Sequence, residues 1–330
     1  MADTGLGVRN LKVVFPCPGG VIRAVEGIDL DIHRGECATL VGESGCGKSV
    51  SALAIMRLLN TPPAVCRVDK LWLDDLDLTH LPDRQMRRIR GKHMAMIFQD
   101  AMTALNPVMT VGKQIDEIYL RHSQLSRREA RQRTIEALEL VGIPEARSRA
   151  NSYPHQLSGG MRQRVLIAMA FACVPKLIIA DEPTTALDVT IQAQVLDVLK
   201  NMQLVHRVSA LLITHDLSVV ANMADTVYVM YAGKIVERAA MQELFLEPLH
   251  PYTHGLLASV PRISDERQPF VQIPGAVPHP MRKPAGCYFH PRCPRSNDLC
   301  RQRMPRLEGP DDGRAVRCWH PLRQPHEVRS

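Results

Sequence analysis

The chain has 330 residues, of which 45% are hydrophobic and 23% charged, so it is long enough for two or three domains and apolar enough to bury a core. Its net charge of +7 comes largely from arginine-rich runs at 84–92 and 126–133, while aromatic residues make up only 4%. Basic grooves for nucleic acid usually interleave stacking aromatics, so no nucleic-acid partner is expected. The runs are interpreted as solvated helix faces or as a surface near anionic lipid.

The sequence also indicates in which cellular compartment the protein works. The first residues lack the apolar segment of a signal peptide, and the longest apolar run, 165–174, is too short to cross a membrane. We therefore expect a cytoplasmic protein that reaches a membrane only through partners. Nine cysteines in that compartment favour thiols or metal ligands over disulfides.

Residues 8–49 predict a sheet followed by a phosphate-binding loop. Alternating residues over 8–36, with a Pro/Gly break at 16–20, indicate antiparallel strands, and the apolar run 37–41 indicates a buried strand. The next eight residues, GESGCGKS, match GxxxxGK[ST], and a helix is expected over 50–59. Curled backbone N–H groups and the helix N-terminus would bind the triphosphate, with Lys48 on the β/γ-phosphates and Ser49 on Mg²⁺. The expected ATP-binding residues here are Gly42, Ser44, Gly45, Cys46, Gly47, Lys48, Ser49 and Val50.

Further along, a strand at 93–98 ends at Gln99, and residues from about 100 to 160 have helical periodicity with no convincing strand. The motif SGGM at 158–161 then precedes another helix. An apolar strand at 177–180 delivers Asp181 and Glu182 at its carboxyl end, where open α/β sheets place their ligands. A later strand, 211–214, ends at His215, and residues 226–237 predict a hairpin.

These motifs, in this order and spacing, resemble the nucleotide-binding subunit of an ABC transporter over residues 8–245. The resemblance implies an α/β fold: a P-loop NTPase core with an antiparallel β subdomain, an inserted helical subdomain at about 100–160 and a small cysteine-containing C-terminal extension. The expected domains are residues 1–245, which bind the nucleotide, and 246–330, which form the extension.

The resemblance also assigns roles to residues outside the phosphate loop. Asp181 would hold Mg²⁺ through its water shell, and Glu182 would polarise the attacking water as general base. Gln99 would reach Mg²⁺ and that water, His215 would bond the γ-phosphate, and Phe15 would stack on adenine.

A second anion site is expected at the start of the helix after residue 158. Ser158, Gly159 and Gly160 would contact ATP held by the phosphate loop of another subunit, so dimerisation would complete the active site. The motif here ends in Met161, whereas the family more often has Gln, which we interpret as a subfamily variation.

The extension carries a family marker and a cysteine cluster. The segment HPYT at 250–253, followed by GLLASVP and IPGAVP, resembles peptide and nickel importer ATPases. Four thiolates suit Zn²⁺ or a [4Fe–4S] cluster, and their spacing does not choose between these; unliganded thiols in a loose tail are the alternative. Resemblance to peptide importers favours iron–sulfur, with His290 and His320 as less favoured substitute ligands. The expected metal ligands are Cys287, Cys293, Cys300 and Cys318, while the other five cysteines are scattered along the chain.

The sequence thus predicts the ATPase subunit of a bacterial importer for di- or oligopeptides, at the cytoplasmic face of the inner membrane. Expected partners are two membrane permease subunits, a second ATPase subunit and an extracytoplasmic solute-binding protein. Nickel, glutathione or a modified dipeptide remain alternative cargoes. A soluble ABC ATPase acting on nucleic acid or the ribosome is the alternative from another class, although such proteins usually carry two phosphate loops in one chain.

Overall fold

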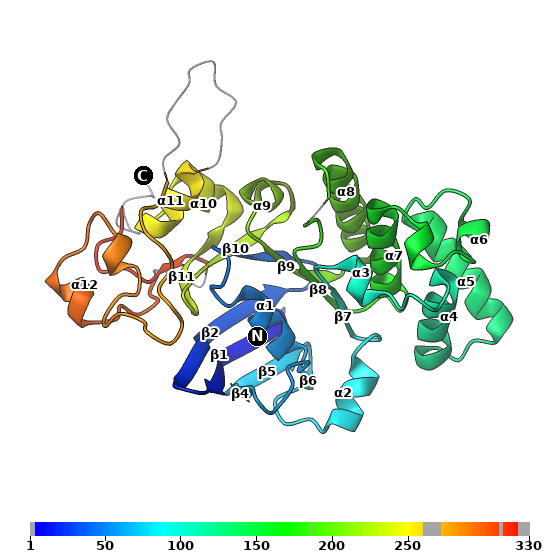
Figure 1. Ribbon diagram of the computed structural model, residues 1–330, viewed down its shortest axis with the longest axis horizontal. Coiled ribbons are helices and arrows are strands. Elements are labelled where there is room, and N and C mark those ends of the chain that lie inside the picture. The colour runs from blue at the N-terminus through cyan, green and yellow to red at the C-terminus, as the bar shows by residue number, and fades with distance from the viewer. Residues whose placement is uncertain (1–3, 186, 260–271, 310–312, 323–330) are drawn as a thin grey trace, which may run out of the picture. The chain divides into compact units, whose positions relative to one another are not determined.

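The computed structural model describes residues 4–185, 187–259, 272–309 and 313–322 (Figure 1). The chain divides into two compact units, each built from several segments. The first comprises residues 1–7, 31–37 and 71–212, and the second comprises residues 8–30, 38–70 and 213–330. The domain boundary expected at residue 245 stays a prediction.

Parallel strands form the sheet of the first unit. β7 (Met94–Ile97) pairs with β8 (Leu177–Asp181), and β9 (Ser209–Thr214) lies on the other side of β8. Every residue of β8 and β9 is buried, which is why both segments read as continuous apolar runs. Since β7 and β8 run in the same direction, Gln99 and Glu182 follow them at the same edge of the sheet.

Helices make up most of the remaining first unit, and the helical periodicity predicted after residue 100 is confirmed. In Figure 1, α4 and α5 lie beside each other, and both pack against α7. A capping box between Ser126 and Glu129 begins α5, and a short hairpin of β5 (Lys70–Leu73) and β6 (Leu76–Asp77) precedes the helices. The helices are α2 (Asp83–Ile89), α3 (Ala101–Ala104), α4 (Val111–His122), α5 (Arg127–Leu140), α6 (Ala146–Arg149), η1 (Pro154–Gln156), α7 (Gly159–Phe171) and α8 (Val189–His206).

The second unit contains two sets of strands. β3 (Cys37–Val41) runs parallel to β10 (Thr226–Tyr231), whose antiparallel neighbour β11 (Lys234–Ala240) pairs with β12 (Ala315–Val316). The hairpin expected over residues 226–237 is therefore confirmed. The other set is antiparallel and consists of β1 (Thr4–Cys17), β2 (Gly20–His33) and β4 (Val65–Arg67).

The helices of the second unit are short. The helix after the phosphate loop, α1 (Lys48–Ile55), ends four residues before the predicted end at 59. Among the residues that the structure describes, no helix is long and apolar enough to span a bilayer. The other helices are α9 (Leu217–Met223), α10 (Met241–Leu246), α11 (Pro251–Ala258), η2 (His290–Arg292) and α12 (Asp298–Gln302).

An aromatic cluster ties the C-terminal extension to the core of the second unit. The ring of Tyr231, at the end of β10, lies 4.6 Å from that of Tyr252 and 5.3 Å from that of Phe289, centroid to centroid. All three side chains are buried together with residues of α9 and β11. The extension is therefore packed on the nucleotide-binding core where it is described, and it is not a loose tail.

Candidate ATP site and cysteine pocket

The phosphate loop follows β3 and has the backbone that its sequence predicts. Gly47 has φ +108°, and a Cβ there would lie 2.5 Å from the backbone oxygen of Ala24, so this position requires glycine. Lys48 is 5% exposed, and its Nζ donates to the carbonyls of Gly42 (2.8 Å) and Glu43 (3.1 Å). These two hydrogen bonds hold the lysine side chain inside the loop. Ser44 and Gly45 are exposed, while Ser49 and Val50 are half-buried at the start of α1.

Cys46 lies inside the phosphate loop but is shielded from solvent. Its side chain is 1% exposed, and burial raises the pKa of its thiol. Both effects lower reactivity, because the thiolate is the form that reacts. Nucleotide binding is therefore not expected to be sensitive to thiol reagents through this cysteine.

Glu43, the second residue of the phosphate loop, is held by two residues of the extension. Its backbone N–H donates to the hydroxyl of Tyr252 at 2.9 Å. Its carboxylate accepts from both terminal nitrogens of Arg292, at 2.7 and 3.0 Å. Sequence reasoning missed Glu43, Tyr252 and Arg292 as site residues. Tyr252 had a signal, since it belongs to the HPYT segment, but Arg292 had none beyond its place next to Cys293.

The HPYT segment begins α11 and turns Tyr252 toward the phosphate loop. His250 is the N-cap, with its Nδ1 accepting from the backbone N–H of Tyr252 at 3.0 Å, and Pro251 occupies the first turn. The buried carboxylate of Glu237 accepts from the backbone N–H groups of Leu249 (2.7 Å) and His250 (2.8 Å). Burial lowers the pKa of His250 to about 3, so its imidazole is neutral in the folded protein. The local sequence thus fixes the start of this helix.

Two of the predicted catalytic residues are in direct contact in the first unit. Gln99 Nε2 donates to Glu182 Oε2 at 3.0 Å, and the hydroxyl of Thr185 donates to the same oxygen at 2.9 Å. Asp181 ends β8 and is 6% exposed, whereas Glu182 has the uncommon φ of +45°. This backbone conformation turns the chain at the sheet edge immediately after the strand. As a result Asp181 is buried at the strand end, whereas Glu182 is half-buried.

The SGGM motif begins a helix, as expected. Ser158 is the N-cap of α7, with its hydroxyl accepting from the N–H of Met161 at 3.3 Å. Gly160 packs closely, because a Cβ there would lie 2.5 Å from Cγ2 of Ile191 in α8. The exposed N-terminus of α7 presents backbone N–H groups and a partial positive charge, the features that bind anions.

Two further predicted site residues, His215 and Phe15, lie at or near strand ends. His215 is exposed between β9 and α9, and Phe15 is half-buried near the end of β1. Their roles stay predictions. Of the family segments used above, the last two residues of GLLASVP, 260 and 261, lie outside the described residues.

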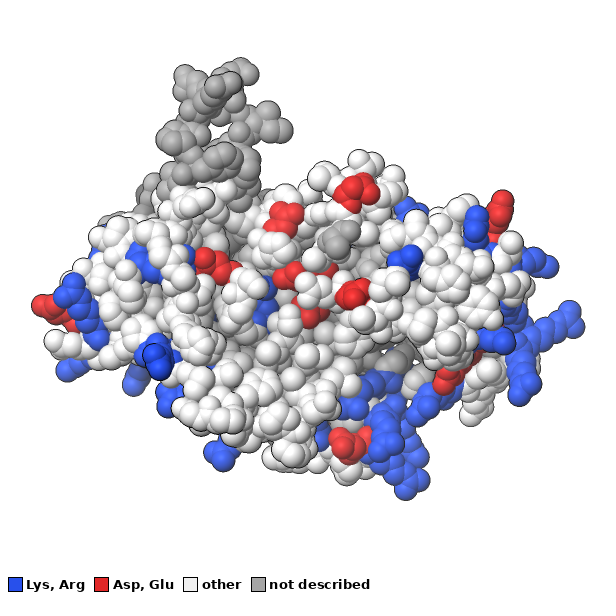
Figure 2. Space-filling view, viewed as in Figure 1, with Lys and Arg blue, Asp and Glu red and all other residues white. Residues whose placement is uncertain are grey.

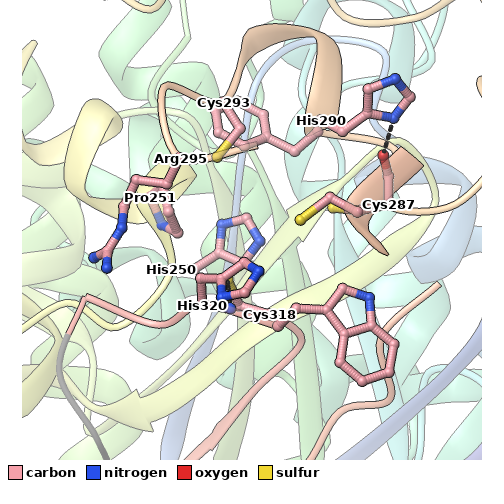
Figure 3. A pocket seen from close by; sticks show the side chains of 11 residues that line it. His250, Pro251, Cys287, His290, Cys293, Arg295, Cys318 and His320 are labelled. Atoms are coloured by element: carbon pink, nitrogen blue, oxygen red, sulfur yellow. Dashed lines mark hydrogen bonds between the residues drawn. The ribbon is translucent and has the colours of Figure 1, made fainter. Parts of the chain in front are cut away.

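The four C-terminal cysteines line one pocket in the second unit (Figure 3). Gly286, with φ +65°, allows close backbone approach, and the N–H of Cys287 donates to the carbonyl of Cys300 at 2.8 Å. Burial and the other three thiols raise the pKa of Cys318 to about 12. Figure 3 shows the sulfur atoms of Cys287 and Cys293 turned toward the same space. The pocket is lined by His250, Pro251, Cys287, Phe289, His290, Cys293, Arg295, Cys300, Cys318, Trp319 and His320.

This pocket does not have the geometry of a site for one metal ion. Within the described residues, no three His, Cys, Asp or Glu side chains are placed to share a single ion. The proposed substitute ligands are also engaged elsewhere: His290 Nδ1 lies 2.9 Å from the carbonyl of Cys287, and His320 Nε2 lies 2.7 Å from Nδ2 of Asn297.

Comparison with known families and proteins decides the identity of the chain. The family described as ABC transporter matches residues 25–185, and the family described as oligopeptide/dipeptide transporter, C-terminal region, matches residues 236–300. The oligopeptide transport ATP-binding protein AppD of Bacillus subtilis is 50% identical over 96% of this chain and 97% of its own. The chain belongs to the ATP-binding proteins of ABC transporters.

Other relatives of this ABC ATPase agree. The dipeptide transport ATP-binding protein DppD of Escherichia coli is 47% identical over 96% of this chain and 97% of its own. Among solved structures, the ATP-binding cassette MJ0796, described as a dimer bound to ADP and Pi, superposes with a TM-score of 0.64 at 26% identity, covering 72% of this chain and 98% of that one. A third likeness is cbiO1 of Clostridium perfringens, with a TM-score of 0.61 and 27% identity over 74% of this chain and 91% of that one. The predicted P-loop ATPase fold is confirmed.

Proposed function

We propose that this ABC ATPase powers the import of di- or oligopeptides across the bacterial inner membrane. The observation that carries the proposal is the contact between Tyr252 of the HPYT helix and Glu43 of the phosphate loop, at 2.9 Å. It joins an extension of the oligopeptide/dipeptide transporter type to the element that binds ATP. Relatives named as oligopeptide or dipeptide transport ATP-binding proteins give further support.

In this proposal Glu182 is the general base of ATP hydrolysis. Its carboxylate is oriented by Gln99 and Thr185, and an oriented carboxylate can take a proton from an attacking water. Asp181 and Ser49 would hold Mg²⁺, which offsets the charge of the phosphates. His215 would bond the γ-phosphate at the end of β9.

The phosphate loop and Phe15 would bind ATP from one side, with the aromatic ring on adenine. Ser158, Gly159 and Gly160 would approach the same nucleotide from a second ATPase subunit, using the N-terminus of α7. The solved structure of MJ0796 is described as a dimer bound to ADP and Pi, which supports dimerisation as part of this proposal.

The expected assembly contains two permease subunits, a second ATPase chain, which we expect to differ from this one, and an extracytoplasmic solute-binding protein. The chain would lie at the cytoplasmic face of the inner membrane, held there by the permeases. No contact with nucleic acid is required, and the two-cassette architecture usual for soluble ABC ATPases is not met by a sequence with one phosphate loop.

The test is the ATPase rate of the complex purified with its permeases, measured with its binding protein and a panel of dipeptides, longer peptides, glutathione and Ni²⁺. Stimulation by peptides supports the proposal and begins to define the cargo, whereas stimulation by Ni²⁺ or glutathione alone replaces the peptide by that cargo. High basal turnover without retained permeases and without any stimulation would favour a soluble ABC ATPase.

We further propose that the cysteine pocket holds a [4Fe–4S] cluster, with Zn²⁺ as the alternative. Tetrahedral Zn²⁺ with Zn–S distances of ~2.3 Å draws four sulfur atoms to about 3.8 Å from one another. A four-iron cluster offers a separate iron to each thiolate, so its ligands stand farther apart. Four cysteines that line one pocket supply the thiolates that either group needs, and the resemblance to peptide importers favours the cluster. Cys287, Cys293, Cys300 and Cys318 would be its ligands.

A further inference from the structure

Arg292 of the extension is buried and forms a two-point ion pair with a half-buried glutamate of the phosphate loop. Its side chain is 5% exposed, and its terminal nitrogens donate to Oε2 and Oε1 of Glu43 at 2.7 and 3.0 Å. Its Nε donates to the carbonyl of Pro274 at 2.8 Å, and the hydrogen bonds with Glu43 raise the pKa of Arg292 above its ordinary value. The planar guanidinium is thus held on both sides, and a lysine could not reproduce this fork.

Glu43 also contacts the lysine of the phosphate loop, so it connects Arg292 to that lysine. Its carboxylate faces Arg292, its N–H faces Tyr252, and its carbonyl accepts from Nζ of Lys48 at 3.1 Å. One residue therefore connects the extension to the side chain that is expected to reach the β/γ-phosphates. Since Arg292 directly precedes Cys293, the same connection joins the phosphate loop to the cysteine pocket.

We propose that Arg292 is a positioning residue for ATP binding, which holds Glu43 and thereby the phosphate loop in its binding conformation. The inference rests on the proposed ATP site. The pair touches no reacting atom, so its loss should weaken the binding of ATP and of the transition state equally. Such a loss raises KM and leaves kcat nearly unchanged.

The test compares Arg292→Met and Glu43→Gln with a control, Arg301→Met, in the full-length chain within its permease complex. Arg301 lies in the same extension, but its ion pair with Asp298 is exposed. For each of the first two variants we expect a rise in KM for ATP of about five- to tenfold, the low end of usual coupling between sites, with kcat within about twofold. The control should keep the KM of the wild type.

The double variant separates positioning from general loosening of the fold. If the ion pair carries the effect, Arg292→Met together with Glu43→Gln should be no worse than either change alone. Additive effects on KM, or an unchanged KM in Glu43→Gln, would overturn the inference. Glu43→Gln leaves every residue of the extension in place, so it remains informative even if Arg292→Met misfolds. Absence of ATPase activity in the wild-type complex would instead refute the proposed function.

A separate observation in the first unit points to an anion site. An open cleft at the end of α2 and α4 is lined by basic residues, and Figure 2 shows the blue side chains gathered there over α2. None of the lining side chains pairs with a carboxylate within the described part of the chain. The cleft is lined by Arg84, Arg87, Arg88, Lys92, Arg121 and His122.

The cleft is built by close packing as well as by sequence clustering. Gly91 has φ +82°, and a Cβ there would lie 2.8 Å from Nε2 of His122, so glycine lets the histidine ring close over the segment after α2. Burial, together with Arg121 and Lys92, lowers the pKa of His122. His122 therefore adds no positive charge to the cleft at neutral pH, and the charge comes from the arginines and Lys92.

We infer that this cleft binds phosphate groups of an anionic ligand, because guanidinium groups without carboxylate partners match phosphate oxygens in pairs. Two sources share this chemistry: the headgroup of an anionic phospholipid and a soluble oligophosphate. The cleft includes residues of the run 84–92, which we interpreted from the sequence only as a solvated helix face or as a surface near anionic lipid.

The experiment uses the full-length chain with saturating Mg-ATP, which occupies the phosphate loop. Binding to phosphatidylglycerol vesicles and to inorganic tripolyphosphate is measured for the wild type, for Arg88→Gln/Arg121→Gln and for the control Arg127→Gln/Arg128→Gln. Two exposed arginines at the start of α5 make the control equal in charge. We expect the cleft variant to lose roughly tenfold or more in affinity, at about a factor of five per arginine, and the control less than twofold.

The arm in which the wild type binds identifies the source of the phosphate. Binding to vesicles alone assigns the cleft to lipid, and binding to tripolyphosphate alone assigns it to a soluble anion. Absence of binding in both arms, or an equal loss in the two variants, would overturn the inference.

Discussion

Gln99 and Glu182, which are 83 residues apart in the chain, are joined by a hydrogen bond of 3.0 Å from Nε2 to Oε2. The contact arises because β7 and β8 are parallel neighbours and both residues follow the carboxyl ends of these strands. Thr185 donates to the same carboxylate oxygen at 2.9 Å. Glu182 is therefore oriented by two donors, which suits a general base.

The first prediction concerns Glu182→Gln. The amide keeps the shape of the side chain but cannot take a proton, so ATP binding should persist while kcat falls at least about 100-fold. Because ATP would remain bound, the variant should accumulate as a dimer with Mg-ATP. Nucleotide binding, turnover and oligomeric state check this in one preparation. Normal hydrolysis by the variant would contradict the assigned base, and Thr185→Val serves as a control that keeps the carboxylate and loses only one hydrogen bond.

Tyr252→Phe should weaken ATP binding. The change removes the acceptor of the Glu43 N–H group, and a buried donor without a partner costs about 1–3 kcal/mol. The matched control is Tyr288→Phe, since Tyr288 lies in the same extension and donates to Glu26 at 3.0 Å, a residue that is not part of the phosphate loop. Titration with Mg-ATP should show a higher dissociation constant only for Tyr252→Phe. Equal affinities in both variants would show that the HPYT helix has no effect on the loop.

The ATP-binding motifs could be predicted from the sequence because each one is local. The motif GESGCGKS can be recognised from its glycines and from the strand and helix that flank it. The fully apolar strand 177–180 likewise indicates that the acids after it lie at a strand end. The contacts of Glu43 could not be predicted, because they depend on residues more than 200 positions away that meet through tertiary packing. The convergence of the four cysteines was predicted, but their irregular spacing could not choose the metal, and the turn at Gly286 that brings Cys287 next to Cys300 was not foreseen.

Cys293→Ser tests the cysteine pocket. A serine hydroxyl is a poor ligand for iron and for zinc, so the variant should lose most of the bound metal and destabilise the extension. Iron, zinc and acid-labile sulfide, measured in anaerobically purified protein, distinguish the two metals. Cys173→Ser is the control, because Cys173 lies outside the pocket. Metal content equal to that of the wild type would refute the site.

Asp74→Asn should make the stability less dependent on acid pH. Asp74 accepts from Lys176 Nζ at 2.6 Å and from Arg34 Nε at 2.9 Å, and its side chain is 8% exposed. Burial alone would raise the pKa of Asp74, but the hydrogen bonds with Lys176 and Arg34 outweigh burial and lower it below its ordinary 3.8. A lowered folded-state pKa means that the carboxylate stabilises the fold above about pH 4 and that this contribution is lost as pH falls through the folded-state pKa.

The free energy of unfolding of Asp74→Asn should therefore lie about 2 kcal/mol below that of the wild type at pH 7, since hydrogen bonds to a charged group are removed. The difference should shrink once the pH falls below 3.8, where the wild-type carboxylate also begins to take up a proton. Urea denaturation at pH 7, 5 and 3 measures both effects. Asp298→Asn is the control, because the Asp298–Arg301 pair is exposed and such pairs contribute little. A difference between Asp74→Asn and the wild type that stayed constant down to pH 3 would show that the side chain acts through packing and not through its charge.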